Sequence, residues 1–323
     1  MREISDGVYQ LEVPMRYNPL GYTYSYLLRD AATLIDTGVG TREALESLSR
    51  QLRRAGIELS EIRHLVVTHL HGDHIGLMEQ IRRISGAKIV AHRRAVEIQR
   101  ERLEDGGRIF EETKNELRLL GGGSYMNFLS GFGDRVRRKR SVFEIDETVE
   151  DGDLLSLEGE EIRVHLTPGH AQEHICLHDE KRHILFSGDH VLPKITPHIS
   201  LHDPWGGDPL REYLQALDKI HGLPVKTVYP AHEHSFDDLD GRISELKIHH
   251  KMRCEEMKEA MRGGAGTVYE ISSKVSWDSR PWPRMDFWTK RMAAAECLAH
   301  LVFMRNNGEI HEESRKGVLH YSL

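Results

Sequence analysis

A short run rich in histidine and aspartate is the part of this sequence best suited to chemistry. It extends from Thr68 to His74 and directly follows the apolar stretch from His64 to Val67. Two histidines one residue apart, His69 and His71, can turn their imidazoles toward one cation. Asp73 and His74, at the start of a following helix, can face a second. Neutral imidazole and carboxylate ligands suit zinc, and also manganese or iron. The spacing therefore predicts a metal centre rather than a set of solvated loop histidines.

Three further potential ligands follow predicted strands elsewhere in the chain. The turn Thr167-Pro168-Gly169 can present His170 at the end of one strand. Asp189 follows a second strand and His232 a third. Each of these residues alone would more often be a structural polar residue, but together with the first run they complete one donor set. The predicted metal ligands are His69, His71, Asp73, His74, His170, Asp189 and His232.

The framework that must position these residues alternates strands with helices. Apolar residues at helical spacing predict one helix between Thr41 and Gly56 and another that continues from His74 to Ile84. The pattern predicts an α/β fold with polar ligands at strand ends. The expected strands are Ser25–Leu28, Thr33–Asp36, Leu65–Val67, Lys88–Ala91, Ile162–Leu166, Ile175–Leu177, Ile184–Phe186 and Thr227–Tyr229.

A charged, helix-like segment interrupts this alternation at about residues 96–143. It contains three consecutive glycines, Gly121 to Gly123, followed by apolar and aromatic residues. This helical insertion could form a glycine-hinged substrate lid, or it could be an ordinary packed hairpin. Its apolar patch consists of Tyr125, Met126, Phe128, Leu129 and Phe132.

Length and composition predict a globular protein with one large and one smaller domain, since 323 residues exceed a typical single domain. No apolar run approaches the length of a bilayer span, and no apolar stretch follows the early charges as in a secretory signal. We therefore expect a cytoplasmic location and no membrane partner.

The net charge of -7 disfavours broad attraction to nucleic acid, although the basic run Arg135–Arg140 could hold an anion. Cys176, Cys254 and Cys297 match no metal or redox spacing, and we expect reduced packing residues.

On these motifs the chain resembles the metallo-β-lactamase superfamily of hydrolases over roughly residues 4 to 240. The resemblance implies an αββα sandwich, in which two β-sheets lie between helices and the metals lie at one edge. The motifs that carry it are His69-Leu70-His71-Gly72-Asp73-His74, Thr167-Pro168-Gly169-His170, Ser187-Gly188-Asp189-His190, Pro230-Ala231-His232 and Leu34-Ile35-Asp36-Thr37-Gly38.

The same resemblance implies a binuclear site with two divalent metal ions, with Zn²⁺ expected first and Mn²⁺ or Fe²⁺ as alternatives. It implies that His69, His71 and His170 ligate the first metal. Asp73, His74 and His232 would ligate the second, and Asp189 would bridge the two. Oxygen-reducing di-iron relatives typically carry glutamate at the position of His71, so this version resembles the hydrolases. Persulfide dioxygenases, which tend to bind one iron, share the short motif and stay a minor alternative.

The C-terminal segment predicts a second, smaller domain. Helices are expected at Arg242–Met261, Thr267–Val275 and Met292–Leu301, followed by a hairpin around Ser314–Gly317. Such a tail resembles the winged-helix-like domain of the lactamase-B-like endoribonuclease and glyoxalase II-related branch. We therefore expect a catalytic domain at residues 1–240 and a winged-helix-like domain at residues 241–323. The histidines of the tail are expected on its surface: His249, His250, His300, His311 and His320.

Two metal ions that share a water molecule lower its pKa, and the resulting metal-bound hydroxide can attack a carbonyl carbon or a phosphorus atom. Asp73 could orient this hydroxide. His174 could protonate a leaving group, or it could be a hydrogen-bonded structural histidine. His190 could point to the other side of its strand.

Three functions compete. The first is a hydrolase of a thioester, ester or lactone, which implies a small-molecule substrate. The second is a metal-dependent endoribonuclease, which needs a continuous basic path from the tail to the metals. The third is a noncatalytic binding protein that retains the fold. A homodimer is an open alternative.

Overall fold

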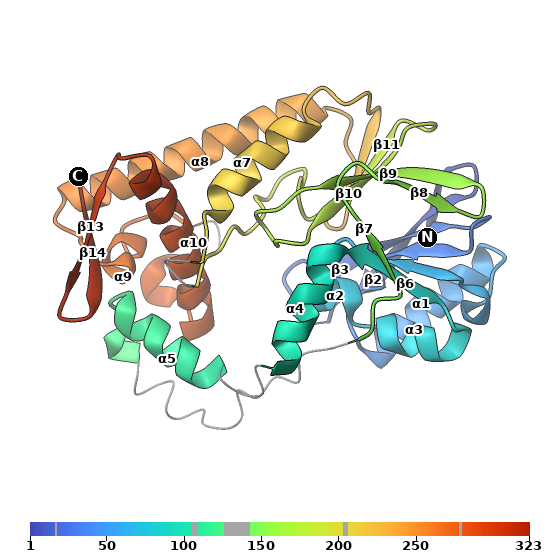
Figure 1. Ribbon diagram of the computed structural model, residues 1–323, viewed down its shortest axis with the longest axis horizontal. Coiled ribbons are helices and arrows are strands. Elements are labelled where there is room, and N and C mark those ends of the chain that lie inside the picture. The colour runs from blue at the N-terminus through green and yellow to red at the C-terminus, as the bar shows by residue number, and fades with distance from the viewer. Residues whose placement is uncertain (17, 105–108, 126–142, 203–205, 278–279) are drawn as a thin grey trace. The chain divides into compact units, whose positions relative to one another are not determined.

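The computed structural model describes the chain except for residues 17, 105–108, 126–142, 203–205 and 278–279 (Figure 1). The basic run Arg135–Arg140 therefore lies outside the described residues, as do Met126, Phe128, Leu129 and Phe132. The described chain divides into two compact units. Unit 1 comprises Met1–Glu104, Arg140–Pro197 and Ala216–Ile243, and unit 2 comprises Asp105–Lys139, His198–Gln215 and Ser244–Leu323. The predicted domain boundary at residue 240 stays a prediction.

Unit 1 contains two β-sheets. In the first, β1 to β4 pair antiparallel, and β4 to β7 pair parallel, in the order β1-β2-β3-β4-β5-β6-β7. In the second, β12 pairs parallel with β11 and the other neighbours pair antiparallel, in the order β12-β11-β10-β9-β8. The strands of the first sheet are Arg2–Ser5, Val8–Pro14, Tyr22–Leu28, Thr33–Ile35, His64–Val66, Lys88–His92 and Glu147–Val149. Those of the second, from β8 to β12, are Leu154–Leu157, Glu160–Leu166, Ile175–Asp179, Ile184–Gly188 and Thr227–Pro230.

Two apolar clusters define the layers of unit 1. One joins residues of both sheets, such as Tyr26 and Val66 with Ile175 and Phe186, so the two sheets pack face to face. The other covers the opposite face of the first sheet, where Leu48 of α1 (Arg42–Arg54) and Ile81 of α3 (Met78–Ser85) are fully buried. The observed layers are thus helix, sheet and sheet, which confirms a mixed α/β fold. The outer helical layer on the second sheet stays a prediction.

The helix predicted from His74 to Ile84 is interrupted. The structure has a short helix α2 (Gly72–Ile75), and α3 begins only at Met78. Gly76 lies at the break, where its backbone packs against Gly40; a Cβ atom on Gly76 would lie 2.1 Å from the Gly40 nitrogen. The prediction of one continuous helix was wrong, because this backbone contact redirects the chain.

Strands β1, β2, β7 and β8 were not predicted; β1, β7 and β8 span only three or four residues each, which gives little periodicity to read. The predicted insertion corresponds to helices α4 (Arg93–Glu104) and α5 (Ile109–Leu119) and the turn η2 (Gly123–Tyr125). A further 3₁₀ turn, η1 (Leu59–Glu61), precedes β5.

Unit 2 contains the predicted C-terminal helices and hairpin. Helix α8 (Leu239–Arg262) enters it, and α9 (Val268–Ser272) and α10 (Phe287–Asn306) follow. The hairpin consists of β13 (His311–Arg315) and β14 (Val318–Ser322), which pair antiparallel. Helix α7 (Pro209–Ile220) and the turn η4 (Trp282–Arg284) are the remaining described elements. No described helix combines the length and apolar character needed to cross a bilayer.

The expected surface position of two tail histidines was wrong. His250 of α8 is 1% exposed and His300 of α10 is fully buried. Their rings meet, with 3.0 Å between His250 Nδ1 and His300 Nε2, and His300 Nδ1 donates to the Glu296 carbonyl at 2.8 Å. Helix packing therefore places this pair in the interior of unit 2. Cys176, Cys254 and Cys297 are buried and free, as predicted.

Candidate metal centre

The seven predicted ligands come from loops that follow strands of both sheets. His69 and His71 follow β5, while Asp73 and His74 lie in α2. His170 lies between β9 and β10, Asp189 directly follows β11, and His232 follows β12. The two sheets of unit 1 therefore bring these segments to one edge, although they are widely spaced in the sequence.

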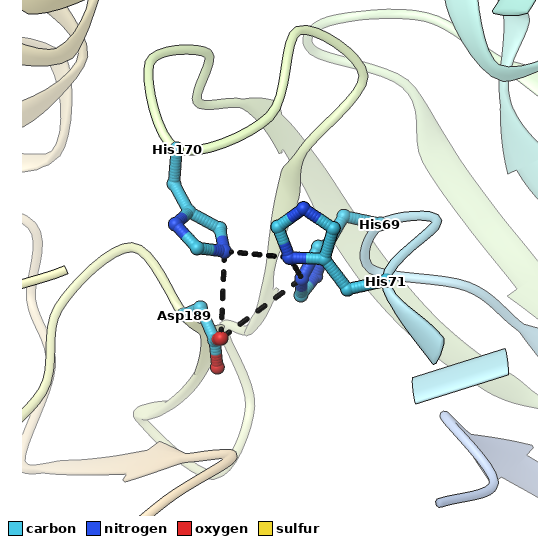
Figure 2. Close-up of side chains that lie close together, drawn as sticks. All are labelled: His69, His71, His170 and Asp189. Atoms are coloured by element: carbon cyan, nitrogen blue, oxygen red, sulfur yellow. Dashed lines mark hydrogen bonds and ion pairs between the residues drawn. The ribbon is translucent and has the colours of Figure 1, made fainter. Parts of the chain in front are cut away.

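The first group contains His69, His71, His170 and Asp189 (Figure 2). Nδ1 of His71 lies 3.0 Å from His69 Nε2 and 2.9 Å from His170 Nε2. Oδ2 of Asp189 lies 3.5 Å from His170 Nε2 and 3.9 Å from His69 Nε2. The four donor atoms all lie within 4.8 Å of one another, a spacing that suits ligands around one cation.

The second group contains Asp73, His74 and His232. Oδ2 of Asp73 lies 3.5 Å from His232 Nε2, and its Oδ1 lies 4.0 Å from His74 Nε2. The other carboxylate oxygen of Asp189, Oδ1, lies 3.5 Å from both imidazoles. Asp189 thus directs one oxygen toward each group, which is the arrangement required of a bridging ligand.

Hydrogen bonds outside the groups select the tautomer of the neutral ring for three imidazoles. The Thr68 hydroxyl donates to Asp36 at 2.6 Å, so its oxygen can only accept from His69 Nδ1, 3.1 Å away. His74 Nδ1 donates to Asp36 Oδ2 at 2.8 Å, and His232 Nδ1 donates to the Tyr22 carbonyl at 3.2 Å. In the neutral form each of these rings carries its one proton on Nδ1, so its Nε2 directs a lone pair into the centre, which is what a metal ligand requires.

Two buried atoms of the centre make no hydrogen bond within the described chain, His74 Nε2 and Asp189 Oδ1. Burying such groups without a partner is costly. A cation between them would satisfy both. The residues present therefore fit a metal at this position.

Burial and the charges of neighbouring side chains shift the pKa values of the ligands in different directions in the two groups. Burial, reinforced by the neighbouring His74, holds the pKa of His69 well below its usual range, and burial with His170 lowers the pKa of His71 to about 3. Burial also disfavours charge on His74, but Asp189 and Asp36 outweigh it and raise its pKa well above the ordinary value. Burial similarly opposes ionisation of Asp189, yet contact with His74 and His232 holds its pKa well below the usual range. The first group is thus rich in neutral imidazoles, and the second has anionic partners that a cation would neutralise.

The supporting residue Asp36 was quoted in a motif but received no role from the sequence. It directly follows β4 and adopts a left-handed φ of 55°. In this conformation Oδ2 contacts both Thr68 and His74, while Oδ1 accepts from the Thr68 backbone amide at 2.9 Å. A single carboxylate therefore orients ligands of both groups.

Glu173 is a second supporting residue that sequence reasoning missed. Its side chain is buried and accepts a hydrogen bond of 2.9 Å from the backbone amide of Leu70. Leu70 lies between His69 and His71, so Glu173 ties the histidine run to the loop that carries His170. The available signal was a carboxylate three residues after a predicted ligand, which alone is too weak to identify.

The geometry of His174 matches the structural one of its two predicted roles. The ring is fully buried; Nδ1 contacts the Thr167 hydroxyl at 2.8 Å, and Nε2 accepts from the Asp189 backbone amide at 3.1 Å. Burial holds its pKa well below the usual range, with a further contribution from His190. Gly188 permits this contact, since its φ is 50° and a Cβ atom there would lie 2.6 Å from His174 Nε2. His190 is fully buried, and burial lowers its pKa to about 3.

Comparison with known proteins decides the family. The family model described as Metallo-beta-lactamase superfamily matches residues 18–232, which is more than half of the chain and includes all seven donors. The chain belongs to the metallo-β-lactamase superfamily. It is a hydrolase of that superfamily, with histidine and aspartate groups suited to divalent metals.

Two named proteins are similar in sequence to this chain over most of its length. The chain is 25% identical over 284 residues to the "Probable metallo-hydrolase YqjP" of Bacillus subtilis, covering 84% of this chain and 85% of that protein. It is 26% identical over 262 residues to the "Atrochrysone carboxyl ACP thioesterase dmxR1" of Cryptosporiopsis sp., covering 76% of this chain. This chain spans 63% of the length of that fungal relative.

Two solved structures of the metallo-β-lactamase superfamily are similar over nearly the whole chain. A metallo-beta-lactamase family protein from Thermus thermophilus has a TM-score of 0.74 and 27% identity, covering 99% of both chains. A beta-lactamase domain protein from Burkholderia ambifaria has a TM-score of 0.78 and 24% identity, covering 100% of this chain and 94% of that one. The latter likeness shows the fold alone.

Proposed function

We propose that this metallo-β-lactamase superfamily protein is a binuclear metallohydrolase of thioesters, esters or lactones, with thioesters favoured. One observation carries the binuclear part of the proposal: Asp189 directs Oδ2 toward the first donor group and Oδ1 toward the second. The thioester preference draws on the Cryptosporiopsis relative, whose name describes an acyl carrier protein thioesterase.

Each donor has a role in this proposal. His69, His71 and His170 hold the first ion, Asp73, His74 and His232 hold the second, and Asp189 bridges them. Two divalent ions, Zn²⁺ first and Mn²⁺ or Fe²⁺ as alternatives, would supply an activated water and polarise the scissile carbonyl. Asp73 suits the orientation of that water because its side chain is 28% exposed, whereas that of His74 is fully buried. His174 acts by holding the Asp189 backbone amide.

Thiol release from a panel of acyl thioesters tests the proposal. Metal-loaded wild type should release thiol, whereas chelated protein and the Asp73→Ala variant should not. Absence of release from protein with two bound metals per chain contradicts the thioester preference. Parallel assays with carboxylic esters and lactones then test the remaining substrates of the proposed class.

The endoribonuclease alternative is tested in the same series with single-stranded RNA. Its support is the C-terminal arrangement of α8, α9, α10 and the hairpin β13–β14, which we propose forms a winged-helix-like domain. Metal-dependent cleavage of RNA without thiol release would favour this alternative. The noncatalytic alternative is disfavoured because the donor set is complete. A cytoplasmic location and a homodimer are further proposals, which fractionation and light scattering test.

A further inference from the structure

Strand β3 carries three tyrosines on one face. Tyr22, Tyr24 and Tyr26 alternate along the strand, and the centroids of neighbouring rings lie 5.0 and 6.3 Å apart. The Tyr26 ring also packs against Phe186 and Tyr229 of the second sheet, with centroids 4.9 and 6.1 Å away. This face of β3 is therefore turned toward the second sheet, and we call its three tyrosines the tyrosine row.

The hydroxyl of Tyr26 holds the last residue of β12. It donates to the Pro230 carbonyl at 2.6 Å, two residues before the ligand His232. Tyr26 is only 3% exposed, so this hydrogen bond lies in the interior of unit 1. Burial also raises the pKa of the Tyr26 hydroxyl well above its usual range. The hydroxyl therefore stays protonated and remains a donor.

The hydroxyls of Tyr22 and Tyr24 hold the residue that follows the ligand. Both donate to the Glu233 carbonyl, at 3.0 and 3.2 Å. Because a carbonyl oxygen has two lone pairs, these two donors saturate it. Glu233 also adopts a left-handed φ of 69°, which residues with a side chain seldom do. The paired hydroxyls thus support an unusual turn directly after His232.

The backbone of β3 holds the two residues between these carbonyls. The Tyr24 amide donates to the Ala231 carbonyl at 2.7 Å. The Tyr22 carbonyl accepts from His232 Nδ1 at 3.2 Å. Every residue from 230 to 233 is therefore hydrogen-bonded to β3, through its carbonyl or, for the ligand, through its ring.

The first donor group has different supports. The Thr68 hydroxyl accepts from His69 Nδ1, and Glu173 accepts from the backbone amide of Leu70. Neither contact involves β3. A change in the tyrosine row can thus disturb the second donor group without removing these supports of the first.

We propose that the tyrosine row positions His232 and thereby sets the affinity of the second donor group for its cation. The three tyrosines are positioning residues, because they act through the backbone on either side of the ligand. This inference rests on the proposed function, which assigns a second ion to Asp73, His74 and His232. Groups that orient a ligand from behind commonly change metal affinity about 10- to 100-fold.

Replacement of tyrosine by phenylalanine removes a hydroxyl and keeps the ring contacts. Competition of the wild type with a chromogenic chelator for Zn²⁺ should give two affinities, one for each position. The affinity that is lost in His232→Ala belongs to the second position. Tyr26→Phe should lower this affinity about 10-fold and leave that of the first position unchanged.

The two hydroxyls on the Glu233 carbonyl should act non-additively. Tyr22→Phe and Tyr24→Phe each leave one donor on that oxygen, so each alone should lower the second affinity only slightly. The double variant leaves the oxygen without either hydroxyl. It should lower the second affinity about 10-fold, which is more than the two single effects combined.

Tyr9→Phe is the matched control. Tyr9 is also a buried tyrosine of the first sheet, but its hydroxyl accepts from Arg29 Nη1 at 3.1 Å. This variant should leave both affinities unchanged. Ser25→Ala is the contrasting variant within β3, because the Ser25 hydroxyl donates to the Asp36 carbonyl at 2.7 Å. Asp36 orients ligands of both groups, so both affinities should fall together.

Two results would overturn the positioning role. One is an unchanged second affinity in both Tyr26→Phe and the Tyr22→Phe/Tyr24→Phe double variant. The other is an equal loss of affinity at both positions in these variants, which would reduce the tyrosine row to a general support of the two sheets.

Proton exchange separates failure of this inference from failure of the binuclear proposal. If wild type binds one ion per chain, the binuclear proposal fails, but the position of His232 can still be measured. In protein with isotope-labelled histidine, the His232 Nδ1 proton is identified by its loss in His232→Gln. It should exchange slowly with water in wild type, because the Tyr22 carbonyl holds it. Faster exchange in the double variant supports the positioning role, whereas identical exchange overturns it.

Discussion

Asp36 and His74 meet across 38 positions of the chain, with 2.8 Å between Asp36 Oδ2 and His74 Nδ1. The same oxygen accepts from the Thr68 hydroxyl, which contacts His69. One carboxylate therefore sets the ring orientation of one histidine in each donor group. Carboxylates behind metal-bound histidines commonly raise metal affinity in this way.

Replacement of Asp36 should weaken metal binding more than it disturbs the fold. Asp36→Asn presents an amide where the backbone and hydroxyl of Thr68 and the ring of His74 need acceptors. We expect metal affinity to fall about 10- to 100-fold, measured by competition with a chromogenic chelator. Asp30→Asn, at an exposed position in the turn between β3 and β4, is the control. Unchanged affinity in Asp36→Asn would show that the two rings are oriented by packing alone.

Asp73 should be essential for hydrolysis but dispensable for folding. Its carboxylate contacts His74 and His232, and its side chain is partly exposed, so Asp73→Ala leaves no large cavity. We expect thiol release to fall by at least about 10²-fold, with little change in the circular dichroism spectrum. The exposed Asp6→Ala serves as the control. Full activity of Asp73→Ala would contradict its assignment to the site.

Removal of the metals should lower both activity and stability. Without cations, the buried His74 Nε2 and Asp189 Oδ1 have no hydrogen-bond partner. A ligand at 1,000 times its dissociation constant stabilises the folded state by about 4 kcal/mol, so chelation should lower Tm by several degrees. Differential scanning calorimetry with verified metal content checks this, and separate additions of Zn²⁺, Mn²⁺ and Fe²⁺ identify the ion that restores turnover. An unchanged Tm after complete metal removal would mean that the donors are satisfied without a cation.

Replacement of His174 should lower kcat by a similar factor for all substrates. Because its two ring nitrogens contact Thr167 and the Asp189 amide, His174→Ala should lower kcat by misplacing Asp189. A general acid matters most for poor leaving groups, whereas a positioning residue does not depend on them. Kinetics with thioesters whose leaving thiols span several pKa units distinguish these roles. A loss that grows steeply with the pKa of the leaving thiol would restore the proton-donor role.

The ion-pair network around Arg182 should make stability depend on pH. Arg182 Nη1 lies 2.7 Å from both Glu160 and Asp179, and its contact holds the pKa of Glu160 below the usual range. Since the folded-state pKa lies below the unfolded value of about 4.3, the stabilisation is complete above that value. It is lost as the pH falls through the folded-state pKa.

Arg182→Met should therefore lower the free energy of unfolding by about 1–2 kcal/mol at pH 7, a modest value because the Arg182 and Glu160 side chains are partly exposed to water. The difference from wild type should shrink below pH 4. Urea unfolding of metal-free proteins at several pH values measures this without interference from the metal centre. Lys88→Met removes an exposed ion pair with Glu147 and should have little effect. A difference that does not vary with pH would place the effect of Arg182 in packing.

The donor set could be predicted because its residues are chemically distinctive and follow strands. Spacing along the chain placed His69, His71, Asp73 and His74 together, and the predicted strand ends explained why His170, Asp189 and His232 should join them. The ring tautomers could not be predicted. They depend on the left-handed turn at Asp36 and on the carbonyl of Tyr22, which only the folded chain brings to the imidazoles.

The helical periodicity of α8 explains why the predicted surface position of His250 was wrong. Along α8 the buried residues Leu246, His250, Cys254 and Met257 recur at helical spacing, so His250 shares the buried face of its helix. Its polarity suggested a surface position, whereas its periodicity indicated the interior. The contact with His300 required the packing of α8 against α10, which no local pattern contains.

The order of the donors along the chain constrains how the protein matures. Synthesis delivers His69, His71, Asp73 and His74 early, whereas Asp189 is translated only after β11, and His232 only after β12, the last strand of the two sheets. A nascent chain that lacks β12 offers an incomplete second donor group, and one that lacks β11 has no shared carboxylate. If the site is binuclear as proposed, loading with two ions would be a late event, and a chain terminated before His232 would lack a ligand of the second group.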